Sequence, residues 1–166
     1  MNKEQVVSAQ SYLSFRLGEE VFAASVAKVM EILEVPKITK VPKSPAYMRG
    51  VVNLRGSVLP VIDTRLKFGM PTASDTVNTC IMVLNVQLDN ESYVLGALVD
   101  AVQEVFEITE DEIKPAPSIG SKYKSEFIEG MVKANEQFIM LLNLDKVFSS
   151  DELSIVKESI AQPIAI

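Results

Sequence analysis

One arginine stands where a fixed positive charge could take part in binding. Two apolar runs, Gly50–Leu54 and Val58–Ile62, flank the segment Arg55-Gly56-Ser57. Gly and Ser between β-branched runs predict a β-hairpin, because Gly adopts the positive φ that tight turns need. The hairpin would carry Arg55 at its tip. A guanidinium binds carboxylates through a planar fork and keeps its proton, so Arg55 suits docking rather than proton transfer; a merely solvated turn residue is the alternative.

The residue types needed for most catalytic and metal sites are missing from this sequence. It has no histidine and one cysteine, Cys80, so it can form neither a nucleophile–histidine pair nor a zinc cage, and it cannot be a phosphohistidine carrier. The phosphate loops GxxxxGK[ST] and GxGxxG are also absent. The 22 Asp and Glu residues leave carboxylate catalysis open in principle, but no spacing singles out a pair. We therefore expect no catalysis, no metal and no cofactor.

Composition narrows the class of protein further. The 166 residues suit one domain or two small subdomains, and 48% apolar residues allow a sizeable core. A net charge of −6 argues against non-specific nucleic-acid binding and against attraction to anionic lipid. No apolar run is long enough for a signal peptide or a membrane span. With a single cysteine, which fits a reducing compartment, the sequence predicts a soluble cytoplasmic protein.

Short strands dominate the predicted secondary structure. Apolar residues alternate or run continuously over five to eight positions, and turn signals recur every 8–12 residues, as in small closed barrels or sandwiches. The stretch 79–86 is continuously apolar, which is typical of a strand buried on both faces. The expected strands are 12–17, 21–24, 37–41, 48–54, 57–62, 79–86, 92–99, 101–108, 127–134 and 137–142.

One helix of about two turns is expected between the second and third strands. Val26, Val29, Met30 and Leu33 fall at i, i+3, i+4 and i+7, which predicts an amphipathic stripe with Val26 and Leu33 in the core. Ile32 lies off this stripe and is expected to be exposed. Shorter helices are expected from Asp63-Thr64 through Phe68, at Glu110–Ile113, after Asn143 or Asp145, and from Ser150 to about Ala161.

Three further local features carry expectations. Pro60 cannot donate to a strand ladder, so its strand is expected at a sheet edge or with a bulge. Gly96 marks another bulge. The polar stretch 69–78, with Gly and Pro, is the best candidate for a mobile loop.

Several segments, in this order, resemble the CheW family of bacterial chemotaxis coupling proteins. The most specific is NLRG preceded by PAY-(x)2-G and followed by P-(x)2-D; NLRG alone would be weak. The resemblance extends from about Tyr12 to Phe148. The matching segments are 15–18, 28–32, 45–56, 60–65, Gly96, 99–100, Val102, 113–117 and 141–143.

The resemblance implies an all-β fold: two SH3-like five-stranded β-barrels packed side by side in a single domain, 1–166, with short helices and a C-terminal helix. It also implies a noncatalytic adaptor. Family members couple the cytoplasmic tips of chemoreceptors (methyl-accepting chemotaxis proteins) to the regulatory domain of the chemotaxis histidine kinase. The expected location is the cytoplasm, with recruitment to membrane-associated receptor arrays but no membrane insertion and no nucleic acid.

Two sets of binding residues follow from matching this sequence to the family. For Val99 and Val102 plain barrel core is an alternative, and for Arg55 a structural pair with Glu31. The receptor-binding set is Val29, Glu31, Ile32, Asn53, Arg55, Gly56, Val99 and Val102. The kinase-binding set is Val41, Pro42, Tyr47 and Met48.

Three other interpretations remain open at this point. The chain could be a coupling protein of a non-motility chemosensory array, with the same fold and a different receptor. It could be a carboxylate-dependent hydrolase on a β-barrel. It could also be a detached regulatory piece of a larger kinase, although Met1 with a polar start and a capped final helix favours a complete chain.

Overall fold

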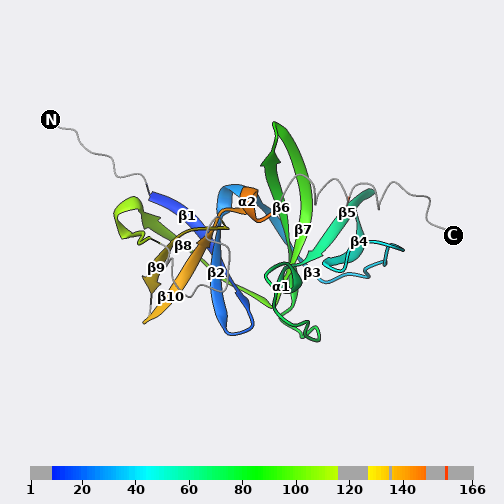
Figure 1. Cartoon of the computed structure of the whole chain (residues 1–166), viewed down its shortest axis with the longest axis horizontal. Coiled ribbons are helices and arrows are strands. Elements are labelled where there is room, and N and C mark those ends of the chain that lie inside the picture. The colour runs from blue at the N-terminus through cyan, green and yellow to red at the C-terminus, as the bar shows by residue number, and fades with distance from the viewer. Residues whose placement is uncertain (1–8, 116–126, 135, 149–155, 157–166) are drawn as a thin grey trace.

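The computed structural model describes residues 9–115, 127–134, 136–148 and 156, and places ten strands in two five-stranded sheets. Each sheet curls into a small barrel, and the barrels lie side by side (Figure 1). The strand order is β8-β1-β2-β10-β9 in the first barrel and β3-β6-β7-β5-β4 in the second. The strands are β1 (Ala9–Leu17), β2 (Glu20–Ser25), β3 (Val29–Glu34), β4 (Met48–Leu54), β5 (Ser57–Asp63), β6 (Cys80–Leu88), β7 (Glu91–Val99), β8 (Ala101–Thr109), β9 (Ile128–Ala134) and β10 (Gln137–Leu142).

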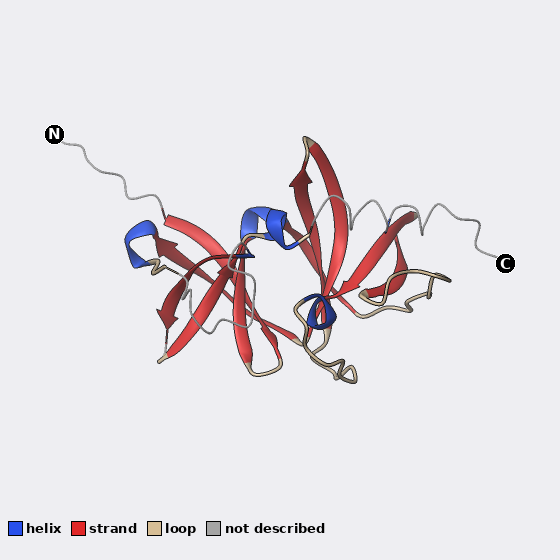
Figure 2. Ribbon diagram, in the orientation of Figure 1, coloured by secondary structure: helices blue, strands red, loops and turns tan. Residues whose placement is uncertain are grey.

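Only short helical segments accompany these strands within the described residues, as Figure 2 shows. The all-β prediction with two five-stranded units is therefore confirmed. Asp63 caps α1 as expected, because its Oδ1 accepts hydrogen bonds from the backbone N–H groups of Arg65 (3.0 Å) and Leu66 (3.4 Å). The segments are η1 (Val26–Lys28), α1 (Thr64–Lys67), η2 (Glu110–Glu112) and α2 (Leu144–Val147).

The helix predicted over residues 26–33 is wrong, because most of this stretch is strand β3. Only Val26–Lys28 is helical, and Val26 is 36% exposed rather than in the core. Ile32 is exposed as expected (44%), but it lies on a strand. The cause is a β-bulge: Val29 pairs with Leu84 and Glu31 with Val83, so one extra residue breaks the period of two.

The strand predicted at 37–41 is also wrong. Thr39 forms one isolated bridge with Val51, in which each backbone N–H donates to the other's carbonyl oxygen, at 2.9 and 2.8 Å. Pro36 and Pro42 flank this stretch and have no N–H to donate, so the ladder stays short. The final helix expected from Ser150 lies outside the described residues apart from Val156, which is helical and buried.

Pro60 lies in β5, an inner strand of the second sheet. However, β5 pairs with β7 only over Val61–Asp63, so Pro60 stands just before that ladder begins. Its other neighbour, β4, pairs with Pro60 through Val51, and this ladder shifts register between Met48 and Gly50, opposite Ile62 and Val61. Over Ser57–Pro60 the described strands pair β5 with β4 alone, so the edge expected at Pro60 is present there, although β5 is an inner strand from Val61 onward.

Gly96 does not mark a bulge, since β6 and β7 pair without any register shift. The structure gives another reason for glycine at this position. A Cβ there would stand 2.7 Å from Cγ2 of Ile81, a fully buried side chain, and 3.3 Å from Cδ2 of Leu59. Gly96 therefore allows the inner faces of neighbouring strands to approach closely.

We expect Gly96→Ala to lower the free energy of unfolding by about 1–3 kcal/mol, because one added methyl overpacks a filled barrel interior. Urea denaturation followed by circular dichroism measures the change. A loss below about 0.5 kcal/mol would mean that Ile81 moves aside easily.

Among the described residues the buried apolar side chains form three clusters, one inside each barrel and one between them. The interior of the first barrel contains Tyr12 and Leu141, and that of the second contains Val61 and Ile81. The third and largest cluster, which we call the seam, draws on both barrels. The seam includes Phe15 and Phe22 of the first barrel, Met82, Leu84 and Val99 of the second, and Phe68, Phe127 and Val156. Burial between the barrels therefore holds them together.

Candidate functional site

The hairpin predicted around Arg55 is present, with a turn of two residues. Arg55 (φ +51°) and Gly56 (φ +88°) connect β4 to β5, and Ser57 already belongs to β5. Two positive φ angles are characteristic of the turn whose twist matches that of the flanking strands. The side-chain oxygen of Asn53 accepts a hydrogen bond from the Gly56 N–H at 2.8 Å. Asn53 and Gly56, both predicted to bind a receptor, thus have a structural task in shaping the turn.

Arg55 forms an ion pair with Glu31 of β3, the structural pairing considered for it above. Its Nη1 donates to Oε1 of Glu31 at 3.3 Å, and its Nη2 donates to Oε2. The hydrogen bond from Arg55 lowers the pKa of the Glu31 carboxyl, so the pair stays charged at neutral pH. The Arg55 side chain is nevertheless 70% exposed, so its guanidinium remains accessible to a partner.

The bulge in β3 separates the predicted receptor residues onto two faces. Val29 lies opposite Leu84 and Ile32 opposite Met82, and both of these partners belong to the seam. Residues opposite each other in antiparallel strands share a face, so Val29 and Ile32 both lie on the seam side. Glu31 lies opposite Val83, which belongs to the interior of the second barrel, and therefore points the other way.

The apolar members of the receptor set lie around the edge of the seam. Val29 and Val102 are partly buried and pack against it, as does Cys80, whose partner across the ladder is Val99. Val99 is only 1% exposed, so in this conformation it offers almost no surface to a partner. Burial raises the pKa of the Cys80 thiol, which keeps it protonated and unreactive at neutral pH.

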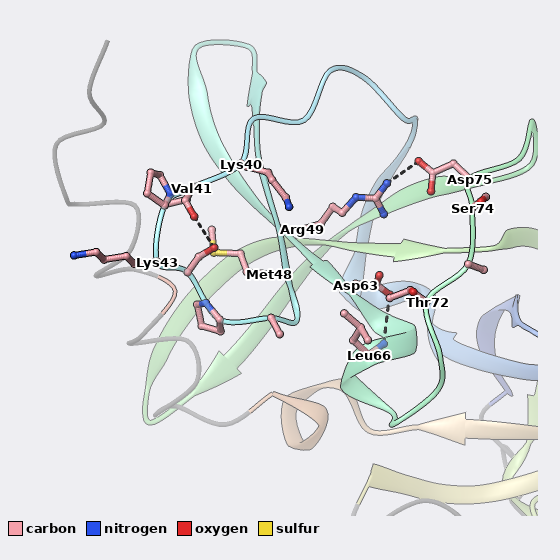
Figure 3. Close-up of a pocket in the computed structure, with 15 residues that line it drawn as sticks. Lys40, Val41, Lys43, Met48, Arg49, Asp63, Leu66, Thr72, Ser74 and Asp75 are labelled. Atoms are coloured by element: carbon pink, nitrogen blue, oxygen red, sulfur yellow. Dashed lines mark hydrogen bonds and ion pairs between the residues drawn. The ribbon is translucent and has the colours of Figure 1, made fainter.

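The kinase set lies at an open pocket of about 620 Å³ in the second barrel (Figure 3). Val41 and Met48 form part of its lining but are themselves buried, whereas Pro42 is exposed. Tyr47 packs against the seam, and its carbonyl oxygen accepts a hydrogen bond from the Asp63 N–H at 2.7 Å. The structure thus gathers Val41, Pro42 and Met48 at one place, with Tyr47 beside them in the chain.

Charged residues of this pocket were not singled out by the sequence. Arg49 Nη2 donates to Asp75 Oδ2 at 3.0 Å, which joins the start of β4 to the loop 69–78 across the pocket (Figure 3). Lys40 and Lys43 also line it. Isolated charged residues do not indicate a pocket in the sequence, because the contacts that bring them together depend on the fold.

The hairpin turn of the receptor set and Met48 of the kinase set lie at opposite ends of one strand. Met48 is the first residue of β4, whereas Asn53 and Arg55 lie at and just past its last residue, Leu54. Seven residues of extended chain place these ends about 20 Å apart. One stiff element therefore carries the Arg55 turn and the Met48 pocket far enough apart for two partners.

Neither a metal site nor a membrane-spanning helix is found among the described residues. Within those ranges no three His, Cys, Asp or Glu side chains are grouped so that they could hold a metal ion. No helix in the described part of the chain is long and apolar enough to cross a bilayer.

Comparison with known proteins agrees with this geometry. The family model of the CheW-like domain matches residues 11–152. The chain is 38% identical over 140 residues to the chemotaxis protein CheW of Rhizobium meliloti, covering 84% of this chain and 88% of that protein. It is 34% identical over 147 residues to CheW of Klebsiella aerogenes, covering 89% and 86%. The scaffolding protein TtCheW of Thermoanaerobacter tengcongensis has a similar structure, with a TM-score of 0.75, 28% identity, and coverage of 92% of this chain and 96% of that one. The chain therefore belongs to the CheW-like domain family and is a noncatalytic scaffolding protein of chemotaxis.

Proposed function

We propose that this protein couples the cytoplasmic tips of chemoreceptors to the regulatory domain of the chemotaxis histidine kinase, in the cytoplasm, where it is recruited to membrane-associated receptor arrays. The observation that carries the proposal is the placement of the Arg55 turn and the pocket beside Met48 at opposite ends of β4. A coupling protein needs two separate contact areas on a rigid body, and about 20 Å of strand supplies the separation.

The receptor surface consists of an apolar part and a polar part. Ile32, Val29 and Val102 line the edge of the seam, and this suits the apolar face of a receptor helix. Arg55 at the neighbouring turn and its ion-pair partner Glu31 in β3 supply charged contacts that fix the helix in register. Asn53 and Gly56 contribute by shaping the turn, and Val99 by supporting the apolar floor from within the core.

The kinase surface is the pocket between residues 40–49 and 72–75. Its volume lies in the range of ordinary ligand pockets, so it can accept one or two protruding side chains of a partner domain. Pro42 offers an exposed rigid contact, while Val41 and Met48 form the wall behind it, with Tyr47 beside them in the chain. A coupling protein of a non-motility array would use the same two surfaces with a different receptor.

The receptor surface is tested with Ile32→Asp, which we expect to fold and to lose at least tenfold in affinity for a receptor-tip fragment. A buried apolar contact replaced by a charge costs more than the 1.4 kcal/mol that tenfold represents. Isothermal titration measures the affinity. The matched control is Val94→Asp, on β7 of the same barrel and similarly exposed (41%), which should bind like the parent protein.

Arg55→Ala extends the same test to the charged part of the surface. Ala and Arg are equally disfavoured at φ +51°, so the substitution removes the charge without adding backbone strain. We expect a nearly unchanged melting temperature and a clearly weaker receptor affinity. If Arg55→Ala unfolds, or binds as tightly as the parent, the pair with Glu31 is only structural.

A further inference from the structure

The described chain crosses from one barrel to the other twice, and an ionic cluster holds each crossing segment in place. The chain passes from β2 to β3 through η1, and from β7 to β8 through Asp100 alone. We call the clusters the Asp145 junction (Lys28, Gln87, Asp145) and the Asp100 junction (Gly18, Arg65, Asp100). Each contains one residue of a crossing segment and one residue from each barrel.

In the Asp100 junction a single carboxylate holds both barrels. Oδ2 of Asp100 accepts a hydrogen bond from the Gly18 N–H, in the β1–β2 turn of the first barrel, at 2.6 Å. Arg65, in α1 of the second barrel, donates from Nε to Oδ1 at 2.9 Å and from Nη2 to Oδ2. The Asp100 N–H also donates to the carbonyl oxygen of Arg16 at 3.0 Å. Burial acts to raise the pKa of Asp100, but the hydrogen bonds from Arg65 and Gly18 lower it overall, so the carboxylate is charged at neutral pH.

The Asp145 junction has a similar arrangement, but here the carboxylate belongs to a barrel and the crossing segment supplies the positive charge. Asp145 lies in α2, which follows β10 of the first barrel, and its Oδ1 accepts from the Gln87 N–H of β6 at 2.9 Å. Lys28, in the crossing segment η1, donates to Oδ1 and Oδ2 of Asp145 at 3.1 and 2.9 Å. In Figure 1 α2 and α1 lie on opposite sides of the seam, at its top and bottom. The junctions thus stand at two ends of the contact between the barrels.

Apolar burial in the seam favours contact between the barrels but is not directional, so by itself it leaves their mutual angle weakly defined. A two-point contact of a guanidinium with a carboxylate has a fixed planar geometry. The Arg65 and Asp100 side chains are only 18% and 30% exposed, so their contact is better protected from water than the pairs Lys28–Asp145, Arg49–Asp75 and Arg55–Glu31.

We infer that Arg65 and Asp100 are positioning residues that fix the angle between the two barrels, with the Asp145 junction as a second, weaker support. Asp100 lies directly between Val99 and the start of β8, which carries Val102. The junction therefore determines where the apolar edge of one barrel stands relative to that of the other. A preformed groove binds more tightly than one that must be ordered on binding. This last consequence rests on the proposed receptor surface; the geometric inference does not.

The inference is tested by measuring the distance between the barrels directly. Spin labels are attached to Glu107→Cys on β8 and Ser57→Cys on β5, both exposed positions, in a Cys80→Ala background of the full chain. Pulsed electron resonance then gives the distribution of label distances. We expect a narrow distribution for this parent, and a clearly broader or shifted one for Asp100→Asn and for Arg65→Lys. Lysine keeps the charge but cannot form the planar two-point contact.

The matched control is Asp75→Asn, which breaks the Arg49–Asp75 pair within the second barrel and should leave the distribution unchanged. If the distribution stays narrow in both junction variants, even with a lowered melting temperature, the junction only stabilises its surroundings and the inference is wrong. Arg65→Lys provides the answer should Asp100→Asn fail to fold.

A second measurement connects the angle to binding. With the receptor-tip fragment, Asp100→Asn should bind roughly tenfold more weakly, within the usual range for residues that act through coupled elements. If the fragment does not bind the parent protein, the proposed receptor function fails, while the distance measurement still decides the role of the junction.

Discussion

Phe68→Ala is expected to lower the free energy of unfolding by about 3–5 kcal/mol, the usual cost of removing a buried phenylalanine ring. Phe68 follows α1 of the second barrel, yet its ring packs between two rings of the first barrel's side of the seam. Its centroid lies 5.4 Å from that of Phe22 in β2 and 6.1 Å from that of Phe127, just before β9. Because two rigid sheets and the Asp100 junction hold the surroundings apart, the cavity left by the substitution cannot collapse.

The control for this prediction is Phe138→Ala, which removes the same ring from an exposed position (54%) on β10. It should change the free energy of unfolding by no more than about 0.5 kcal/mol. Urea denaturation followed by both circular dichroism and tyrosine fluorescence measures the two variants. Near-equal losses for Phe68 and Phe138 would contradict the role given to the seam. Separate transitions for the two probes in Phe68→Ala would indicate that the barrels unfold one after the other.

Most strands could be predicted from the sequence because their pattern is local. Alternation identifies β1, and the continuous apolar run identifies β6, whose central residues Ile81–Leu84 are fully buried. The hairpin of β4 and β5 follows from a glycine turn between β-branched runs, and the Asp63 cap from one side chain and its next neighbours. In each case the information lies within about ten residues.

The errors arose where distant contacts override a local pattern. In β3 the bulge places Val29 and Ile32 on one face of the strand. Apolar residues three positions apart then give the pattern that is typical of a helix. A glycine inside a strand pattern predicts a bulge at Gly96, whereas the real reason for glycine, the clash of a Cβ with Ile81, involves another strand and leaves no local pattern. Such spatial neighbours cannot be read from single-residue preferences.

The binding residues likewise divide into those that a local pattern predicts and those that depend on distant contacts. Arg55 and its turn could be predicted, and so could the exposure of Ile32. The burial of Val99 was one of the two alternatives that the sequence left open. The burial of Met48 could not be predicted, because it depends on the seam between two separately predicted barrels. The Asp100 junction joins residues 35 and 82 positions apart, and no local pattern marks it.

We expect two variants, each defective at one surface, to abolish kinase stimulation when tested alone. A mixture of the two should not restore it. Ile32→Asp disables the proposed receptor surface. For the kinase surface we choose Ala46→Arg, because Ala46 is exposed and lines the pocket, whereas substitution of the buried Val41 or Met48 would also affect folding. Each variant should keep its affinity for the partner at its intact surface. Pull-downs with the receptor fragment and with the kinase regulatory domain check this separation.

The mixture tests whether both surfaces must act on one molecule. A protein that holds two partners at once raises their local concentration for each other, to about millimolar for short connections, and a protein that holds only one contributes nothing of this kind. In a reconstitution of receptor, kinase and adaptor, the mixture of Ile32→Asp and Ala46→Arg should therefore stay at the stimulation measured without adaptor. The double variant gives the lower limit of kinase stimulation in this assay, and the unmodified protein gives the upper limit. Full recovery by the mixture would mean that each partner responds independently to its own bound adaptor, and coupling through one molecule would then be the wrong mechanism.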